Sequence, residues 1–283
     1  MKIGILCSKI RIEEKLLFKE FDKLGVKIVQ LDPRELSLTG DKNVFAGIDL
    51  VLNREIGQTR AELILEFIEN LGIRVINSAG ATILCNNKTL TTQVLEKNSL
   101  PVPKTVLTFS QEQALMAAKK IGFPVVIKPV WGSWGRLISK ADTYEALEAI
   151  LEHKEALGSP QHSIFYLQKF IFKPGRDIRV FVVGGKAITA MYRVSEHWLT
   201  NTAKGAVPKN MKLNKEISDL VEKAVKFLGV EIAGVDLVEH EKGYLFFEVN
   251  ATPEFHGLKA VSQVNIPELI VQYVLKEAKN GKN

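Results

Sequence analysis

Residues 234–250 read Gly-Val-Asp-Leu-Val-Glu-His-Glu-Lys-Gly-Tyr-Leu-Phe-Phe-Glu-Val-Asn, two apolar runs on either side of a polar turn. This pattern predicts a β-hairpin that turns at residues 240–243. Folding about that turn places Asp236 opposite Glu248, to within one residue of register. The last third of the chain is therefore expected to be a mostly antiparallel sheet with helices. Its other predicted elements are strands at 164–170, 178–183 and 187–193 and a helix around 217–228.

The same hairpin brings together oxygen atoms that could bind a metal ion. Because side chains alternate along a strand, Glu248 and Asn250 are expected to project together, with Tyr244 and Phe246 on the same face. Two carboxylates and an amide oxygen among apolar neighbours would repel one another unless a cation lies between them. Magnesium suits such a site when phosphates supply its remaining ligands. The alternative is that Asp236 and Glu248 are half-exposed strand residues near a turn.

Lysine and glycine residues farther upstream predict a phosphate-binding loop. Lys128 ends a short strand at 124–128, and the sequence Trp-Gly-Ser-Trp-Gly-Arg follows at 131–136. Glycines let backbone N–H groups approach phosphate oxygens, and a lysine supplies a compact charge. Lys88, at a helix start, is a weaker candidate for the same role. A solvated lysine beside an ordinary turn is the alternative.

Arginines on two further strands could hold two anions together. Asp177 and Arg179 alternate with Ile178, so both are expected on one side of their strand. Arg193 closes the next strand. Arginines that face carboxylates and phosphates suit the transfer of a phosphoryl group to an anion, because both reactants are negative. Ion pairs between exposed strand charges explain the pattern equally well.

The first part of the chain alternates strand-like and helix-like stretches, which predicts a small, mainly parallel βαβ sheet. One helix is expected to end at Gly25, and another to open with a capping box at Thr59 and to end at Gly72. No Gly-x-Gly-x-x-Gly follows the first strand, and the P-loop and Gly-x-Ser-x-Gly signatures are absent, which excludes those three kinds of site. The expected strands are 2–6, 26–31, 48–52 and 74–76.

Pro101 and Pro103 predict a boundary, since two prolines so close together cannot continue a helix. Beyond them a small α+β unit is expected. Its elements are a helix from Ser110 to near Gly122, the strand at 124–128, and a helix that opens at 142–145 and runs towards Gly158.

The composition is that of a globular protein with a moderate positive charge. The 283 residues are 46% hydrophobic and 25% charged, and 38 basic against 32 acidic residues give a net charge of +6. The basic residues are scattered, which argues against nucleic-acid binding. The two cysteines and five histidines show no disulfide pattern or metal-ligand spacing. No apolar run is long enough for a membrane span or a signal peptide, so a cytoplasmic location is expected.

Four blocks of sequence stand in order along the chain. They are Lys-Pro-Val-Trp-Gly-Ser-Trp-Gly-Arg at 128–136, Lys-Pro-Gly-Arg-Asp-Ile-Arg-Val-Phe-Val-Val-Gly at 173–184, His-Trp-Leu-Thr-Asn-Thr-Ala at 197–203 and Asn-Ala-Thr-Pro-Glu-Phe at 250–255. Together with Lys88, Gln168 and Asp236 they resemble the ATP-grasp superfamily, in the branch of the ribosomal-protein S6 glutamate ligase. The similarity is greatest to the LysX/ArgX ligases of lysine and arginine biosynthesis, and it extends over essentially the whole chain. The last block resembles a segment of the members that use 2-aminoadipate.

The resemblance implies an ATP-grasp fold with an N-terminal parallel βαβ domain at 1–85, a central α+β lid at 86–165 and a C-terminal, mostly antiparallel domain at 166–283. ATP would lie between the last two. The implied ATP contacts are Lys88, Lys128, Gly132, Ser133, Trp134, Gly135, Gln168, Lys169 and Phe170, with Asp177 at the ribose. The implied magnesium ligands are Asp236, Glu248 and Asn250. Residues implied to face the acyl phosphate and the substrate carboxylates are Arg179, Arg193 and Asn201, with further substrate contacts from His197, Trp198, Thr252, Glu254 and Phe255.

The activity implied by the resemblance is that of an ATP-dependent carboxylate–amine ligase. It would join the α-amine of 2-aminoadipate to the C-terminal glutamate carboxylate of a small acidic amino-group carrier protein, through an acyl phosphate. The net charge of +6 fits an acidic partner, and a homo-oligomer is expected. The alternatives are glutamate as the amine, dual function, or a glutamate ligase for another protein tail or a small cofactor. A nucleotide-binding module without turnover is a further alternative, disfavoured because all three implied metal ligands are present.

Three positions depart from the family pattern. Asn87 stands where many relatives have Asp, and Lys204-Gly205-Ala206 stands where a basic residue followed by two glycines is usual. His256-Gly257 follows Phe255 where a lysine is common. The last departure lies nearest the residues implied in substrate choice.

Overall fold

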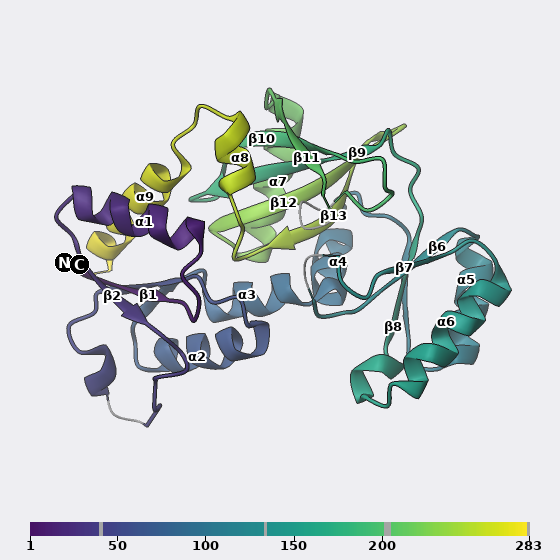
Figure 1. Cartoon of the computed structure of the whole chain (residues 1–283), viewed down its shortest axis with the longest axis horizontal. Coiled ribbons are helices and arrows are strands. Elements are labelled where there is room, and N and C mark those ends of the chain that lie inside the picture. Colours follow the sequence, from purple (N-terminus) through teal and green to yellow (C-terminus); the bar gives the residue numbers. More distant parts are fainter. Residues whose placement is uncertain (40–41, 133–134, 201–204, 282–283) are drawn as a thin grey trace.

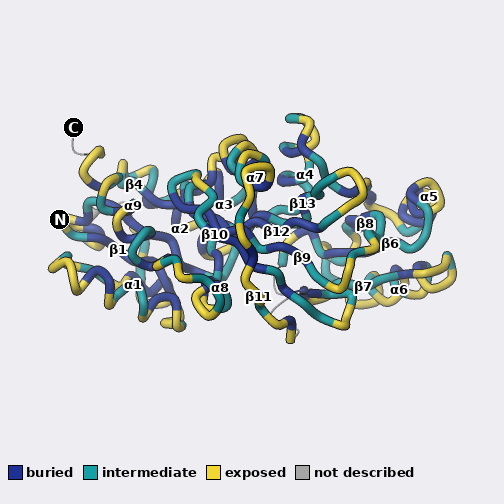
Figure 2. The backbone as a smooth tube through the Cα atoms, turned by 90° about the horizontal axis from the view of Figure 1, so that it is seen from above, coloured by how far each residue is buried: buried dark blue, intermediate teal, exposed yellow. Residues whose placement is uncertain are grey.

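The computed structural model describes residues 1–39, 42–132, 135–200 and 205–281 of the chain. Within these residues, three sheets follow one another along the long axis of the molecule (Figures 1 and 2). A parallel sheet lies near the two termini, a five-stranded antiparallel sheet occupies the middle, and a four-stranded antiparallel sheet projects at the other end. This mixture of a parallel N-terminal sheet with antiparallel sheets confirms the expected fold class.

The N-terminal sheet is parallel, with the strand order β2-β1-β3-β4. The capping box expected at Thr59 is not formed, because the N–H of Ala61 already bonds to the carbonyl of Gly57 at 2.8 Å and makes Gly57 the N-cap. The elements are β1 (Lys2–Leu6), α1 (Ile12–Lys23), β2 (Lys27–Leu31), the 3₁₀ helix η1 (Lys42–Phe45), β3 (Leu50–Asn53), α2 (Gln58–Asn70) and β4 (Arg74–Ile76).

Helix α9 (Ile266–Asn280) returns from the end of the chain to cover this N-terminal sheet. It lies beside α1 in Figure 1, and its Ile270 and Val274 share one buried cluster with Leu17 of α1 and with Ile3 and Ile5 of β1. Helix α2 covers the opposite face of the sheet. Neither α9 nor any other helix of the described residues is long and apolar enough to cross a membrane. The division of the chain after residues 85 and 165 stays a prediction.

The four-stranded sheet and its two helices form a unit that we call the lid. The expected helix caps are present, because Ser110 Oγ accepts from the backbone N–H of Gln113 at 3.3 Å and Thr143 Oγ1 accepts from that of Ala146 at 3.2 Å. The lid sheet has the order β5-β8-β6-β7. Its elements are β5 (Thr105–Thr108), α5 (Gln111–Ile121), β6 (Val125–Lys128), β7 (Ser139–Ala141), α6 (Tyr144–Ala156), the 3₁₀ helix η2 (Pro160–Ser163) and β8 (Phe165–Lys169).

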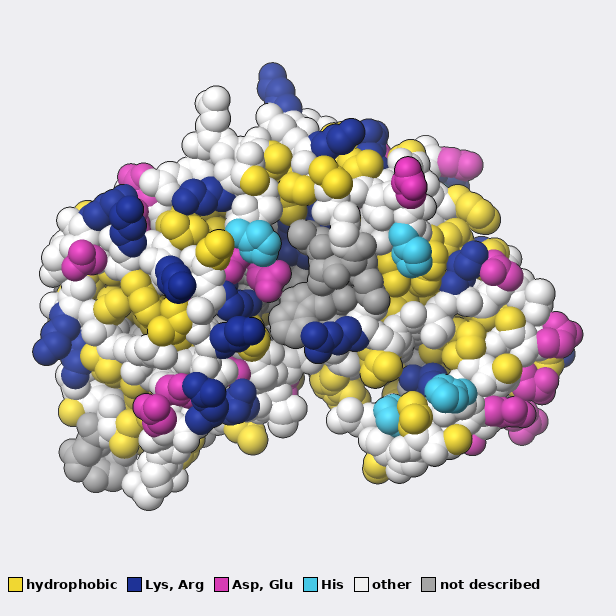
Figure 3. Space-filling model, viewed as in Figure 1, with side chains coloured by type: hydrophobic (Ala, Val, Ile, Leu, Met, Phe, Trp, Pro, Cys, Tyr) yellow, Lys and Arg dark blue, Asp and Glu magenta, His cyan; other side chains and the backbone are white. Residues whose placement is uncertain are grey.

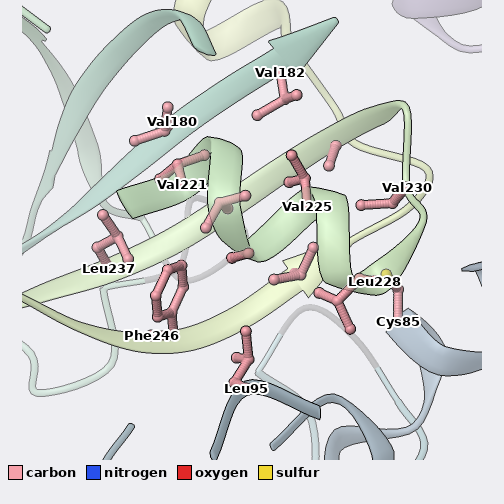
Figure 4. Close-up of a cluster of buried hydrophobic side chains, with 14 of the residues drawn as sticks. Cys85, Leu95, Val180, Val182, Val221, Val225, Leu228, Val230, Leu237 and Phe246 are labelled. Atoms are coloured by element: carbon pink, nitrogen blue, oxygen red, sulfur yellow. The ribbon is translucent and has the colours of Figure 1, made fainter. Parts of the chain in front are cut away.

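The central sheet is antiparallel, with the order β11-β10-β9-β12-β13. Its strands are β9 (Arg176–Val183), β10 (Lys186–Val194), β11 (Val207–Met211), β12 (Ile232–His240) and β13 (Gly243–Asn250). Helix α7 (Lys215–Leu228) covers one face, and Figure 4 shows Val180, Leu237 and Phe246 of the sheet against Val221 and Val225 of that helix. The remaining helices are α3 (Ala79–Asn86), α4 (Lys88–Lys97) and α8 (His256–Val261).

The hairpin of β12 and β13 contains a bulge. Asp236 pairs with Glu248, which confirms the expected register, but Leu237 pairs with Phe246. Phe247 is therefore an extra residue in β13. A bulge of this kind shifts the alternation of side chains by one position.

The bulge overturns one expectation about the faces of β13. Phe246 is buried in the core beneath α7, and Tyr244 packs against that core. Glu248 and Asn250 line cavities elsewhere. The expectation that all four side chains share one face is therefore wrong, because strict alternation does not continue through the extra residue.

Candidate active site

A first cavity lies where the lid meets the central sheet, and it contains most of the side chains expected to bind ATP. It encloses about 780 Å³, part of which is open to solvent. Figure 3 shows lysine, arginine and acidic side chains near the middle of this face. The sequence-predicted residues that line the cavity are Lys88, Lys128, Gly132, Gly135, Gln168, Lys169, Phe170, Asp177, Arg193, Trp198, Asp236 and Glu248.

Lys128 is a buried cation in this cavity. Strand β6 packs Val125 and Ile127 beneath the lid helices, so the alternating Lys128 faces the other side. Its Nζ donates to the side-chain carbonyl of Gln168 at 2.6 Å and lies 4.8 Å from the ring centroid of Phe247. Burial lowers the pKa of Lys128 to about 8. Because its hydrogen-bond acceptor is a neutral amide, its charge can still bind an anion.

Lys88 reaches the same cavity from the first residue of α4. Asn87 caps this helix, because its Oδ1 accepts from two backbone N–H groups of the first turn at 3.0 and 3.1 Å. Asn87 therefore caps the helix, although many relatives have Asp at this position. Lys88 Nζ donates to the carbonyl of Gly132 at 2.6 Å and lies 3.2 Å from Glu248 Oε1. Lys88 therefore joins the glycine loop to the hairpin.

Two aspartates and two arginines form a buried network on the cavity face of the central sheet. The strand register creates the pairs, since Asp177 lies opposite Arg193 and Asp236 lies opposite Arg179. Arg193 Nε donates to Asp177 Oδ1 at 2.7 Å, and its Nη2 lies 2.9 Å from Asp236 Oδ2. Arg179 donates to Asp236 through Nε and Nη2. A Cβ at Gly234 would lie 2.8 Å from Arg179 Nη1, so glycine leaves the room that this arginine needs.

The network keeps Asp236 and Arg193 charged. Burial alone would raise the pKa of Asp236, but Arg179 and Arg193 lower it below its usual range. Burial alone would lower the pKa of Arg193, but Asp236 and Asp177 raise it. Both groups therefore remain ionised at neutral pH.

Asp177 has further partners behind the network. Thr200 Oγ1 donates to Asp177 Oδ2, and Lys173 Nζ donates to Thr200 Oγ1 at 2.6 Å. Burial lowers the pKa of Lys173. The Asp177 carboxylate, which the resemblance implies as a ligand of the ribose, is thus already hydrogen-bonded to protein side chains. Its contact with the ribose stays a prediction.

A second cavity lies beside the first. It encloses about 1060 Å³, part of it open to solvent, and Arg193 and Glu248 line both cavities. Arg11 and Arg179 also face it, so three arginines surround one space. Arg11 Nη2 pairs with Glu14 at 2.8 Å. The other sequence-predicted residues that line this cavity are Asn250, Thr252 and Glu254.

The three predicted magnesium ligands lie at facing positions of the hairpin. Asp236 is opposite Glu248, and Asn250 is opposite Gly234. In the described part of the chain, His, Cys, Asp and Glu side chains alone form no cluster for a metal ion. The amide oxygen of Asn250 and the phosphates of a nucleotide would have to complete the set. Carboxylate, amide and phosphate oxygens are the donors that magnesium prefers, so these residues fit that ion.

Aromatic residues lie at one end of the first cavity. Phe170 and Trp198 both line it, with ring centroids 6.0 Å apart, and the exposed ring of His197 lies 5.8 Å from that of Trp198. Trp198, which the resemblance implies as a substrate contact, lines the first cavity, where the nucleotide is expected, and its role as a substrate contact stays a prediction. The predictions for Ser133, Trp134 and Asn201, and the departure at Lys204, lie outside the described residues.

Phe255 is not exposed to either cavity. Its side chain is 1% exposed and packs edge-to-face on Phe181, with ring centroids 5.9 Å apart. The expected direct contact between Phe255 and the substrate is therefore wrong, because the ring is buried in the core. Thr252 and Glu254, the other two residues expected from this segment, line the second cavity.

Several residues that line the cavities were not anticipated from the sequence, among them Lys173, Phe247 and Arg11. Lys173 stands in the 173–184 block, four residues before Asp177, and this spacing could have indicated it. Phe247 faces the first cavity only because of the bulge. Arg11 precedes two glutamates at the start of α1, which is a helix-capping signal rather than a site signal.

Comparisons with known proteins agree along the whole chain. Residues 3–83 match the model of the LysX preATP-grasp domain, and residues 85–274 match that of the RimK-like ATP-grasp domain. An alpha-aminoadipate–LysW ligase LysX from Sulfurisphaera tokodaii is 37% identical over 97% of this chain and 98% of that protein. A glutamate–LysW ligase ArgX from Sulfolobus acidocaldarius is 31% identical over 97% of this chain and 98% of that protein. A RimK domain ATP-grasp protein from Sphaerobacter thermophilus has the same fold, with a TM-score of 0.83 at 24% identity over 97% of this chain and 100% of that one.

Proposed function

Because the chain belongs to the RimK-like ATP-grasp family, we propose that it is an ATP-dependent ligase that joins the α-amino group of 2-aminoadipate to the C-terminal glutamate carboxylate of a small acidic carrier protein. The observation that carries this proposal is that the two cavities meet at Arg193 and Glu248. ATP in the first cavity and an amino acid in the second would meet the carrier carboxylate at this junction. The name of the LysX relative gives alpha-aminoadipate and LysW as the two molecules that the relative joins.

Charge and leaving-group chemistry dictate the order of the steps. A carboxylate oxygen is a poor leaving group, so it must first be phosphorylated. The carrier carboxylate attacks the γ-phosphorus of ATP, the bond to ADP breaks, and an acyl phosphate forms. The neutral α-amine then attacks the acyl carbon, inorganic phosphate leaves with the former carboxylate oxygen, and the amine gives up a proton. No nucleophilic side chain is required.

The side chains of the chain would hold these anions in place. Lys88 and Lys128 would bind ATP phosphates, and Arg179 and Arg193 would face the acyl phosphate and the substrate carboxylates. The fixed positive charge of Arg193 lies where negative charge develops, which is worth several kcal/mol of barrier in a site shielded from water. We assign the aromatic end of the first cavity, beside Phe170, to adenine.

Asp236, Glu248 and Asn250 would hold magnesium together with the phosphates. When bound there, the ion neutralises phosphate charge and orients the transferred group. Glu248 lines both cavities, so it would serve the phosphoryl transfer at the junction.

The acidic carrier protein is the proposed macromolecular partner. A net charge of +6 favours the approach of an acidic protein over a basic one. A cytoplasmic location and a homo-oligomer accompany this proposal as predictions.

The amino-acid preference is the first test of the proposal. With purified carrier protein and saturating ATP, kcat/KM for amide formation is expected to be higher for 2-aminoadipate than for glutamate. One methylene is worth about 1 to 3 kcal/mol in a fitted pocket, so measurable activity on glutamate is expected as well. The control is a carrier that lacks its terminal glutamate. With this carrier the enzyme should release no phosphate from ATP. A tenfold preference for glutamate would mean that this chain catalyses the reaction for which the ArgX relative is named. The proposed ligase mechanism would still hold.

The Lys128→Met variant tests the nucleotide assignment. Loss of a charged contact with phosphate is expected to raise KM for ATP about tenfold to a hundredfold. Because burial lowers the pKa of Lys128 to about 8, the charged form is lost as the pH rises through that value. The wild-type affinity for ATP is therefore expected to weaken above about pH 8, whereas that of the variant should lack this step.

Steady-state kinetics from pH 6.5 to 9.5, the range that brackets this pKa, measure both effects for Lys128→Met. Lys104→Met is the matched control, because Lys104 is an exposed lid lysine that bonds to the carbonyl of Lys120. An unchanged KM for ATP in Lys128→Met would remove Lys128 from the nucleotide site.

A further inference from the structure

The segment that links β13 to α8 forms one wall of the second cavity. Residues 251–254 all line the cavity, and the half-buried Thr252 and Glu254 alternate with the buried residues 251, 253 and 255. Ala251 and Phe255 have buried side chains, 4% and 1% exposed. The position of this backbone therefore sets where the two cavity side chains stand.

Two buried side chains from the N-terminal part of the chain hold the carbonyls of this segment. Asn77 Nδ2 donates to the carbonyl of Ala251 at 2.7 Å, and Arg54 Nη1 donates to the carbonyl of Pro253 at 3.0 Å. Asn77 is 1% exposed and Arg54 is 3% exposed. Arg54 is itself fixed, because its Nε donates to Glu14 at 2.9 Å.

A third side chain holds the N–H groups at the end of the segment. Glu13 Oε1 accepts from the backbone N–H of Phe255 at 3.2 Å and from that of His256 at 3.1 Å, and it lies 2.6 Å from His256 Nδ1. Glu13 is 2% exposed. Burial alone would raise the pKa of Glu13, but these hydrogen bonds lower it. An ionised acceptor makes the stronger hydrogen bond.

We infer that Glu13, Arg54 and Asn77 are positioning residues for the amino-acid substrate. Their side chains form hydrogen bonds with the backbone at residues 251, 253, 255 and 256. Thr252 and Glu254, which lie within this segment, line the second cavity. The N-terminal domain thus determines amino-acid selectivity through the backbone that it holds, without contact between these three side chains and the substrate. This inference rests on the proposed ligase function.

A small shift of this backbone is expected to change amino-acid selectivity strongly, because the two candidate amino acids differ by only one methylene. A displacement of about 1 Å in a substrate-binding group can cost about a hundredfold in rate. Release of one of these bonds is therefore expected to change the amino-acid kinetics and to leave the kinetics of ATP unchanged, since the first cavity lies on the other side of Arg193 and Glu248.

The experiment compares Glu13→Ala with Glu13→Gln. Alanine removes the acceptor, and glutamine keeps a carbonyl oxygen of the same reach. Glu13→Ala is expected to raise KM for 2-aminoadipate about tenfold and to change the ratio of kcat/KM for 2-aminoadipate over glutamate at least about threefold, with KM for ATP within about twofold of wild type. Glu13→Gln is expected to restore both amino-acid parameters to within about threefold.

The matched control is Glu20→Ala, on the same helix, where the glutamate pairs with Lys23. It should lower stability slightly without changing the selectivity ratio. Hydrogen exchange measures the bonds directly, and exchange at the N–H groups of Phe255 and His256 should accelerate in Glu13→Ala alone. If Glu13→Ala does not fold, Glu13→Asp replaces it and is judged by the same criteria, because it keeps the carboxylate and withdraws it from the N–H groups of Phe255 and His256 by one methylene.

Two results would overturn the inference. One is a folded Glu13→Ala enzyme with wild-type selectivity, whether or not exchange is faster. The other is a change in KM for ATP as large as the change for the amino acid, which would indicate general loosening. Failure of the ligase proposal is distinguishable, because the wild-type enzyme would then form no amide with either amino acid.

Discussion

Arg193→Met is expected to lower kcat by about a thousandfold and the free energy of unfolding by about 3 to 5 kcal/mol. Methionine keeps much of the length of the side chain but removes the charge that pairs with Asp177 and Asp236. The two aspartates are each 4% exposed, so they lose a partner in a place that is largely shielded from water. Arg193→Lys keeps the charge but loses the several N–H donors that a guanidinium directs at the two aspartates. It should therefore retain more stability than activity.

The control for Arg193 is Arg176→Met in the same sheet. Arg176 also binds a carboxylate through two nitrogens, with distances of 2.7 and 2.8 Å to Glu239, but this pair is partly exposed. Its loss should cost less than about 1 kcal/mol and leave kcat unchanged. Urea unfolding and steady-state kinetics of both variants measure the two effects. Retention of kcat within tenfold in Arg193→Met would exclude the junction of the cavities as the reaction centre.

Glu248→Gln is expected to abolish measurable turnover, a loss of about a thousandfold or more, while the unfolding midpoint stays within a few degrees. Glutamine has nearly the same shape, so little packing is lost. The negative charge that would bind magnesium and that pairs with Lys88 is removed. Magnesium binding in the presence of ATP, measured by titration rather than by turnover, should weaken in the variant.

Two further variants complete this test. Asn250→Ala should behave as Glu248→Gln does, because both lie in the predicted magnesium set. Glu239→Gln, at the far end of the same hairpin, should leave turnover and the magnesium requirement unchanged, since Glu239 pairs with Arg176. Wild-type turnover in Glu248→Gln would remove the metal assignment and leave Glu248 as the partner of Lys88 only.

The sequence predicts those parts of the site that depend on local geometry. The pairing of Asp236 with Glu248 follows from a short turn between two apolar runs, and structure and expectation agree there. The shared side of Asp177 and Arg179 follows from alternation along one strand, and both residues join the buried network. Lys128 faces the cavity for the same reason. Each of these features is set within a few residues of sequence.

Features that depend on distant partners could not be predicted in this way. The bulge at Phe247 arises from how β13 pairs with β12, and nothing in the alternation of its own residues indicates it. Glu13, Arg54 and Asn77 carry ordinary sequence signals for a helix start and for strand ends. Their bonds to residues 251–256 exist only after the first and last parts of the chain have come together.

The return of α9 to the first sheet also has a consequence for synthesis on the ribosome. Ile3, Ile5 and Leu17 emerge well before Ile270 and Val274, which share their buried cluster. The bond between Glu13 and His256 likewise spans 243 positions. At about 5 to 20 residues per second, that separation leaves one apolar face of the nascent sheet uncovered for on the order of tens of seconds. Because long-range contacts close slowly, that exposed apolar face is where the growing chain is most prone to aggregate.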